Sequence, residues 1–149
     1  MSLGQDRALF GGLLRKDARL PVSFAGFLNQ TEMPNAYAAA DCLVLPSDFG
    51  ETWGLVVNEA MVCGLPAIVS DRVGCGPDLV QDGVTGTIFP FGDVNELAKR
   101  MIDMAADREK RESMGEQAVI RVREYTVERA AEGAMAAFNF VTSKPAIFK

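Results

Sequence analysis

Short apolar runs alternate along this chain with longer segments in which apolar residues recur every three or four positions. Short uninterrupted runs are typical of buried strands, and the longer spacing is typical of helices. Strands are predicted at residues 22–27, 42–45, 67–69 and 86–89. Helices are predicted at residues 7–16, 32–40, 55–63 and 77–81. Because the two kinds of element alternate, the pattern predicts an α/β domain, a parallel sheet flanked by helices.

Residues 42–45, Cys-Leu-Val-Leu, are apolar throughout, and the run stops at Pro46. A run without polar positions indicates a strand that is buried on both faces. We therefore expect this strand at the centre of the sheet. The helix that follows it, residues 55–63, is expected to end at Gly64, because glycine adopts the left-handed conformation at helix ends and Pro66 prevents continuation.

The pattern changes at residue 93, after which no strand signal remains. Asp93 and Thr126 are expected to cap helices that run to about residues 105 and 141, and a further helix is predicted at 108–125. No linker, repeat or low-complexity segment separates these helices from the rest of the chain. Residues 1–149 are therefore predicted to form a single domain with covering helices from about residue 93.

The charge balance argues against a nucleic-acid partner. The 149 residues include 15 Lys and Arg against 20 Asp and Glu, a net charge of −5, whereas nucleic-acid-binding domains carry a basic patch.

The longest apolar stretch, residues 60–69, is far shorter than the roughly 20 residues that cross a bilayer. The first residues lack the basic and apolar regions of a secretory signal. We expect no nucleic acid, no membrane span and a cytoplasmic location.

The absence of histidine from the sequence excludes Ser-His-Asp and Cys-His nucleophile systems within this chain. The three cysteines, Cys42, Cys63 and Cys75, have neither disulfide-framework nor zinc-site spacing. We expect them to be reduced and at least two of them to be buried. Asp-x-Asp and P-loop motifs are also absent, so no metal site and no cofactor is predicted.

Glycine is frequent just after the predicted strands, where ligands bind in open parallel sheets. The loops that begin at Gly26, Pro46 and Ser70 are expected to converge on one edge of the sheet. The second loop runs into the helix that begins at Leu55, and a helix N-terminus with free backbone amides is suited to phosphate. Gly54 would let an anion approach these amides closely, although glycine also occurs in ordinary turns.

Two glutamates flank this helix end. Glu59 lies about one turn into the helix, roughly 6–8 Å along its axis, where a carboxylate could accept hydrogen bonds from ribose hydroxyls; the alternative is a solvated surface glutamate. Glu51 precedes the helix and could contact a sugar, or it could simply cap the helix. Trp53 is expected to be a core or rim aromatic, and the alternative is a stacking platform. Asp48 and Arg72 either line the rim or are ordinary loop residues.

Residues 38–93 resemble the donor-binding domain of the retaining nucleotide-sugar glycosyltransferases of family 4, also called glycosyltransferase group 1. The resemblance is carried by a Glu-x7-Glu element, Glu51 and Glu59, and by the Gly54-Leu55 turn between them. The helix exit around Gly64 and the Asp-Gly loop at residues 82–86 match as well. The likeness extends back to residue 22 and covers roughly three-quarters of the chain.

The resemblance implies a GT-B architecture, in which two Rossmann-like domains face each other and the C-terminal one holds a nucleotide-diphosphate sugar. Glu51 is then the catalytic residue, in contact with the donor sugar. Glu59 holds the ribose, and the amides of Gly54 and Leu55 hold the diphosphate. The full set of donor-binding residues is Glu59, Gly54, Leu55, Thr52, Gly50, Gly26 and Phe27. The family transfers the sugar with retained configuration and needs no metal.

The sequence departs from the family pattern in two ways. No counterpart of the family's opening strand, Gly-Arg loop and lysine precedes Arg7, and Asp78 stands where the family has glutamate. The chain is therefore expected to be the C-terminal half of a GT-B enzyme, truncated on its N-terminal side and inactive alone. A missing N-terminal domain would hold the acceptor, a sugar or lipid, and the whole enzyme could associate peripherally with membranes. The alternatives are a nucleotide-sugar-modifying enzyme such as an epimerase, or a non-catalytic nucleotide-binding module.

Overall fold

The computed structural model describes residues 22–143. The chain divides into two compact units, residues 1–32 and 33–149, and each is described by itself. The helix predicted at residues 7–16 lies outside the described residues.

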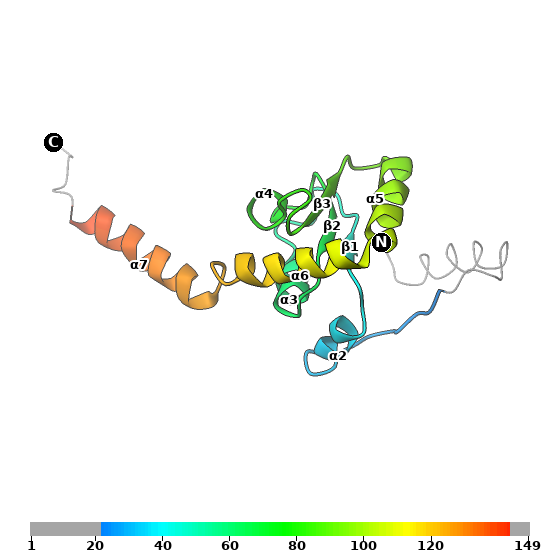
Figure 1. Cartoon of the computed structure of the whole chain (residues 1–149). Helices are drawn as coiled ribbons and strands as arrows, with labels where there is room; N and C mark the ends of the chain where they lie inside the picture. Colours follow the sequence, from blue (N-terminus) through cyan, green and yellow to red (C-terminus); the bar gives the residue numbers. More distant parts are fainter. Residues whose placement is uncertain (1–21, 144–149) are drawn as a thin grey trace. The chain divides into compact units, whose positions relative to one another are not determined.

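A parallel sheet forms the centre of the second unit (Figure 1). Its strands are β1 (Leu43–Leu45), β2 (Ala67–Ser70) and β3 (Gly86–Phe89). They are hydrogen-bonded in the order β1-β2-β3, with Val44 beside Ile68 and Ile68 beside Thr87. Three of the four predicted strands, and the parallel sheet itself, are confirmed.

The prediction that residues 42–45 form the central strand is wrong. Among the described residues β2 is the middle strand, with all four residues buried, whereas β1 is at the edge and half-buried. The two faces of β1 contact different helix-covered clusters, Leu45 one and Val44 the other. The apolar run therefore correctly indicates covered faces. The position of a strand in the sheet depends instead on its hydrogen-bonded neighbours, which hydrophobicity does not report.

The prediction of a strand at residues 22–27 is also wrong. This segment of the first unit has no helix or strand, and Phe27 is 92% exposed. Gly26 has a φ angle of 76°, whereas a strand requires φ near −120°. The left-handed residue interrupts the extended backbone, so alternating apolar residues alone are insufficient to form a strand there.

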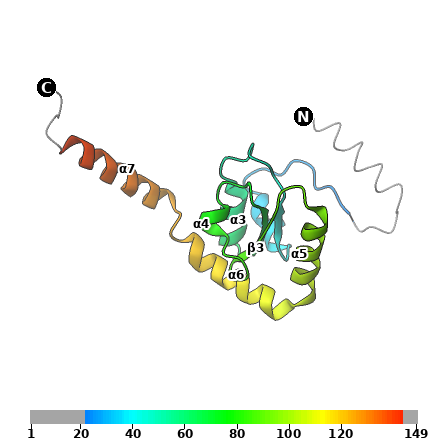
Figure 2. The same ribbon diagram turned by 90° about the horizontal axis from the view of Figure 1, so that it is seen from above.

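Helices cover both faces of the sheet (Figure 2). The helix α3 (Leu55–Val62) packs with α4 (Gly76–Leu79) against one face, through a core that includes Val57 and Val69. On the other face, α5 (Val94–Ala106) brings Met104 against Ile68. The long helix α6 (Arg108–Val122) contributes to both cores. This packing fixes the start of α3 at the carboxyl ends of the strands.

The remaining helices are α2 (Met33–Ala38), which precedes β1, and α7 (Val127–Thr142), which ends the described residues. The predicted caps are confirmed, because the Asp93 carboxylate accepts a hydrogen bond from the Glu96 amide at 2.9 Å and the Thr126 hydroxyl accepts one from the Arg129 amide at 3.3 Å. None of the helices within residues 22–143 combines the length and the apolar character needed to cross a bilayer.

Candidate functional site

The loops after β1 and β2 are joined to each other by hydrogen bonds to main-chain carbonyls. The Ser70 hydroxyl donates a hydrogen bond to the Ser47 carbonyl. The amide of Gly74 donates to the Glu51 carbonyl at 3.3 Å, and the amide of Cys75 donates to the Trp53 carbonyl at 2.8 Å. These contacts confirm that the two loops converge at the carboxyl ends of the strands.

The loop after β3 joins the same edge. The Asp71 amide donates to the Phe89 carbonyl at 2.9 Å, and the Asp71 carboxylate accepts a hydrogen bond from the Phe91 amide at 2.8 Å. The Arg72 guanidinium lies over the rings of Phe49 and Phe91, 4.6 Å and 4.9 Å from their centroids. The sequence placed Arg72 either at the rim or in an ordinary loop, and these contacts place it at the rim. The third loop at the carboxyl ends of the strands therefore follows β3. The loop at Gly26, which was predicted for this place, follows no strand.

Gly54 shapes the N-terminus of α3. Its φ and ψ angles are 97° and 59°, in the left-handed region, and it is buried. A β-carbon at this position would lie 3.1 Å from Leu45 Cδ2 and 3.2 Å from Val73 Cγ1. The site therefore requires glycine for its conformation and for the space around it.

The first amides of α3 have no protein partner. No side chain caps the helix, and within the described residues the amides of Gly54, Leu55 and Val56 donate no hydrogen bond. Unpartnered N–H groups at this end carry the positive pole of the helix dipole. This combination can bind a phosphate or another small anion.

Glu51 lies at the start of this helix end with its carboxylate available. Its amide and carbonyl are engaged, with Asp48 and Gly74 respectively. The carboxylate is part-buried and has no hydrogen bond or ion pair within residues 22–143. It accepts no amide of α3, so Glu51 does not cap this helix through a side-chain hydrogen bond.

Glu59 follows on the second turn of α3 and is exposed. Its Oε2 atom accepts a hydrogen bond of 2.8 Å from the Tyr37 hydroxyl on α2. Glu59 is therefore more than a solvated surface glutamate. Sequence reasoning missed Tyr37, because an aromatic residue in an alanine-rich helix resembles any core residue.

The other predicted donor residues are divided between the two units. The Gly50 amide donates to the Asp48 carboxylate at 2.8 Å, and Thr52 is exposed beside it. Leu55 is 69% exposed at the first turn of α3. Gly26 and Phe27 belong to the first unit, so their predicted contact with the nucleotide stays a prediction.

Trp53 has a structural role, as predicted. Its indole nitrogen donates to the Asn58 side chain at 2.8 Å, its ring centroid lies 6.1 Å from that of Tyr125, and it packs against the core. These contacts anchor the last residues of the loop before α3.

The cysteines are free thiols, but the expectation that two are buried is wrong. Only Cys75 is buried, Cys42 is half-buried and Cys63 is exposed.

Burial raises the pKa of the Cys75 thiol to about 11, and the negative charge of Glu51 also raises it. Cys75 lies against Gly54, and it stays neutral there at physiological pH. Its protonated state keeps an additional negative charge away from the anion site.

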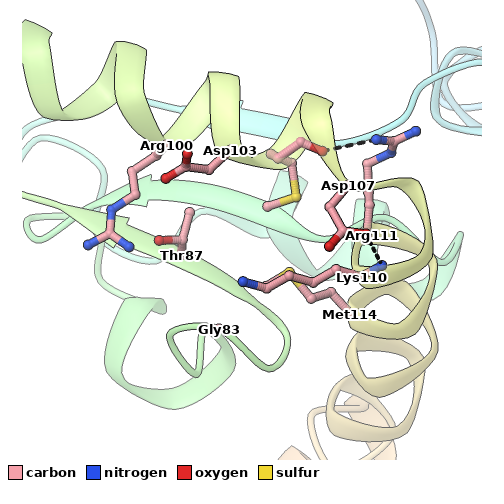
Figure 3. A pocket seen from close by; sticks show the side chains of 9 residues that line it. Gly83, Thr87, Arg100, Asp103, Asp107, Lys110, Arg111 and Met114 are labelled. Atoms are coloured by element: carbon pink, nitrogen blue, oxygen red, sulfur yellow. Dashed lines mark hydrogen bonds between the residues drawn. The ribbon is translucent and has the colours of Figure 1, made fainter.

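A pocket of about 70 Å³ lies elsewhere, near the amino ends of the strands (Figure 3). Its two arginines are engaged in structural contacts. Arg111 donates to the Met104 carbonyl at 2.9 Å and to the Asp41 carboxylate at 3.1 Å, and Arg100 lies 3.6 Å from Asp82. The pocket is lined by Gly83, Thr87, Arg100, Asp103, Met104, Asp107, Lys110, Arg111 and Met114.

Asp82 holds this region together as a carboxylate. Burial alone would raise its pKa, but hydrogen bonds from Thr87 and Ile88 and the charges of Arg100 and Lys110 outweigh burial and lower the pKa. Contacts of Thr87, Arg100 and Arg111 thus connect β3, α5 and α6 around the pocket. No group of three or more Cys, Asp or Glu residues placed to hold a metal ion is found in the described part of the chain.

Comparison with known proteins identifies the family. The family model of the glycosyl transferases group 1 matches residues 15–121. The sulfoquinovosyl transferase SQD2 of Arabidopsis thaliana is 41% identical over 109 residues, which cover 71% of this chain and 21% of that protein. The D-inositol 3-phosphate glycosyltransferase of Kribbella flavida is 37% identical over 106 residues, covering 71% and 24%. The chain thus spans about a fifth to a quarter of the length of these relatives.

Solved structures show the same fold. Sucrose-phosphate synthase from Thermosynechococcus elongatus superposes with a TM-score of 0.79 at 29% identity, covering 96% of this chain and 36% of that one. HepE of Anabaena, solved in complex with UDP-glucose, superposes with a TM-score of 0.73 at 25% identity, covering 93% and 37%. These neighbours are GT-B glycosyltransferases. By its sequence, its parallel sheet and its structural neighbours, the chain belongs to the glycosyltransferase group 1 family.

Proposed function

We propose that this chain is the donor-binding domain of a retaining glycosyltransferase and binds a nucleoside-diphosphate sugar. The observation that carries the proposal is the N-terminus of α3, where partnerless amides lie between the carboxylates of Glu51 and Glu59. The amides are suited to phosphate and the carboxylates to hydroxyl groups. The HepE structures with UDP and with UDP-glucose support the same ligand class.

In this proposal the α3 amides of Gly54 and Leu55 bind the diphosphate. Transfer breaks the bond between the anomeric carbon and the diphosphate oxygen, and the electron pair stays on that oxygen. Amide dipoles that are already aligned stabilise this developing charge without reorganisation. The acceptor hydroxyl oxygen forms the new bond to the anomeric carbon with retained configuration, and the hydroxyl proton passes to the departing diphosphate oxygen. The diphosphate is held by amides, without a metal ion.

The other proposed roles follow from position. We assign Glu51 as the catalytic residue in contact with the donor sugar, because it precedes the proposed phosphate site and its carboxylate has no partner in the described residues. Glu59 accepts hydrogen bonds from the ribose, and Gly50 and Thr52 complete the loop around the donor. Gly26 and Phe27 would contact the nucleobase side of the ligand.

The wider setting belongs to the same proposal. Residues 1–149 would act as one donor-binding domain, and an N-terminal acceptor domain would supply a sugar or lipid acceptor. We propose a cytoplasmic location, which the exposed free thiol of Cys63 supports, because unpaired surface thiols persist in reducing compartments.

Calorimetric titration of the chain with UDP, GDP and ADP tests the proposal. We expect one nucleotide to bind and Glu59→Ala to weaken it about tenfold, or about 1.4 kcal/mol. Glu116→Ala is the matched control, since Glu116 is an exposed helix glutamate on α6 with no partner in the described residues. Absence of binding at millimolar concentration, or equal affinity of Glu59→Ala and Glu116→Ala, would contradict the proposal.

A further inference from the structure

Tyr37 is buried beside α3 with its hydroxyl group on Glu59. The side chain is only 6% exposed, and it packs with Ala60 and Leu65 in a cluster that also contacts Leu43. The hydroxyl donates a hydrogen bond of 2.8 Å to Glu59 Oε2, across 22 residues of sequence. A polar contact of this kind connects a fixed core ring to an exposed carboxylate.

The ring determines where the carboxylate lies, and not the reverse. Burial in this cluster restricts the Tyr37 ring, whereas an exposed helix glutamate samples several rotamers. A hydrogen bond from the fixed phenol selects the rotamers that bring Oε2 to it. The carboxylate of Glu59 is therefore oriented before any ligand arrives, which lowers the entropic cost of binding.

The hydrogen bond leaves Glu59 able to bind a diol. Each carboxylate oxygen has two lone pairs, so three acceptor positions remain after Tyr37 occupies one. A ribose offers two neighbouring hydroxyl donors. Burial raises the pKa of Tyr37 well above its ordinary value of 10, and the hydrogen bond to Glu59 raises it further. The phenol thus remains a donor throughout the physiological pH range.

We infer that Tyr37 is a positioning residue for Glu59 and, through it, sets a preference for ribonucleotides over deoxyribonucleotides. The inference rests on the proposed function, because it requires Glu59 to bind the ribose. Tyr37 itself touches no part of the ligand. Loss of the Tyr37 hydroxyl would leave the Glu59 carboxylate present but no longer oriented. Only the part of the nucleotide affinity that comes from the ribose hydroxyls should then fall.

Titrations of the whole chain with two ligands provide the test. One is the nucleoside diphosphate that the chain binds, and the other is the same nucleotide without its 2′ and 3′ hydroxyl groups. We expect Tyr37→Phe to weaken the ribonucleotide three- to tenfold and to leave the affinity for the dideoxynucleotide unchanged. Tyr125→Phe is the matched control, because it removes the hydroxyl of the other tyrosine, which donates to Asp78. The control should keep the full ribose preference.

A merely structural role for Tyr37 would weaken both nucleotides equally, and that result would overturn the inference, as would unchanged affinity for both. Glu59→Asp is a second variant at an exposed position. Its carboxylate is one methylene too short to reach Tyr37 and the ribose together, so its ribose preference should fall. Full preference in Glu59→Asp would also overturn the inference, and this readout stands even if Tyr37→Phe does not fold.

Failure of the inference and failure of the proposed function give different results. If Glu59→Ala abolishes the ribose preference and Tyr37→Phe retains it, Glu59 binds ribose without help from Tyr37. If Glu59→Ala leaves nucleotide affinity unchanged, the ribose-binding role of Glu59 is itself wrong.

Discussion

Replacement of Gly54 by alanine tests whether the left-handed residue at the start of α3 is required by backbone conformation and by space together. Gly54 has a φ angle of 97°, and a β-carbon there would approach the side chains of Leu45 and Val73 to 3.1 Å and 3.2 Å. Gly92 has a similar φ angle of 83° but has nothing within 4 Å of the same position. Gly92→Ala therefore measures the conformational cost without the contact.

The two variants should differ in the free energy of unfolding. A left-handed conformation costs a non-glycine residue about 1–2 kcal/mol, which is the whole expected effect of Gly92→Ala. Overpacking of a core typically adds about 1–3 kcal/mol. Because the groups near Gly54 are methyls that can shift by a few tenths of an ångström, we take the lower part of that range. Gly54→Ala should then cost about 2–4 kcal/mol in total.

Urea unfolding followed by circular dichroism measures both values. With a slope of about 2 kcal/mol/M, Gly54→Ala should lower the urea midpoint by about 1–2 M, and Gly92→Ala by less than 1 M. Nucleotide titration of the same samples should show weakened binding only for Gly54→Ala, because only that substitution displaces the α3 amides. Equal destabilisation by the two variants would show that the contacts with Leu45 and Val73 carry no cost.

Three further outcomes are expected. A β-carbon on Gly74 would lie 1.9 Å from the Thr52 carbonyl oxygen, so Gly74→Ala should push the two loops apart. Titration should show weakened nucleotide binding in this variant under conditions where urea unfolding shows that the chain is still folded. Thiol labelling followed by mass spectrometry should modify Cys63 quickly and Cys75 only on unfolding or at strongly alkaline pH, because Cys75 is buried with a raised pKa; rapid labelling of both would contradict its burial. The lowered pKa of Asp82 in the folded state means that its ionisation stabilises the fold above the unfolded pKa, about 3.9, and that this contribution is lost as pH falls through the folded pKa. Urea unfolding of Asp82→Asn should therefore show a deficit at pH 7 that shrinks towards pH 3, and a constant deficit would refute the electrostatic origin.

Most of the fold was predictable because its signals are local. The run Gly86–Phe89 matches the predicted strand, and Asp93 and Thr126 cap the helices that they were expected to cap. A cap depends on one side chain and an amide three residues away, so a short stretch of sequence determines it. The order of strands does not have this property, which is why residues 42–45 were placed at the centre of the sheet instead of its edge.

The candidate site divides in the same way. Glu51, Gly54 and Glu59 lie on one loop and helix, so their spacing in the sequence already fixes their arrangement. The contribution of Tyr37 depends on how α2 packs against α3. Tyr37 lies 22 residues from Glu59 in the sequence, so no local pattern reports their contact. Gly26 shows the opposite failure, because its left-handed φ angle breaks a strand that the neighbouring residues favour.

The loop before α3 is held by backbone hydrogen bonds from Gly74 and Cys75 to the carbonyls of Glu51 and Trp53. Every residue has a carbonyl group, so these two hydrogen bonds do not themselves depend on the side chains at positions 51 and 53. A substitution at the exposed Thr52 should therefore leave the geometry of the loop unchanged. The loop thus separates two requirements, because its backbone sets its course and the side chain at position 52 sets the chemistry that it presents to solvent.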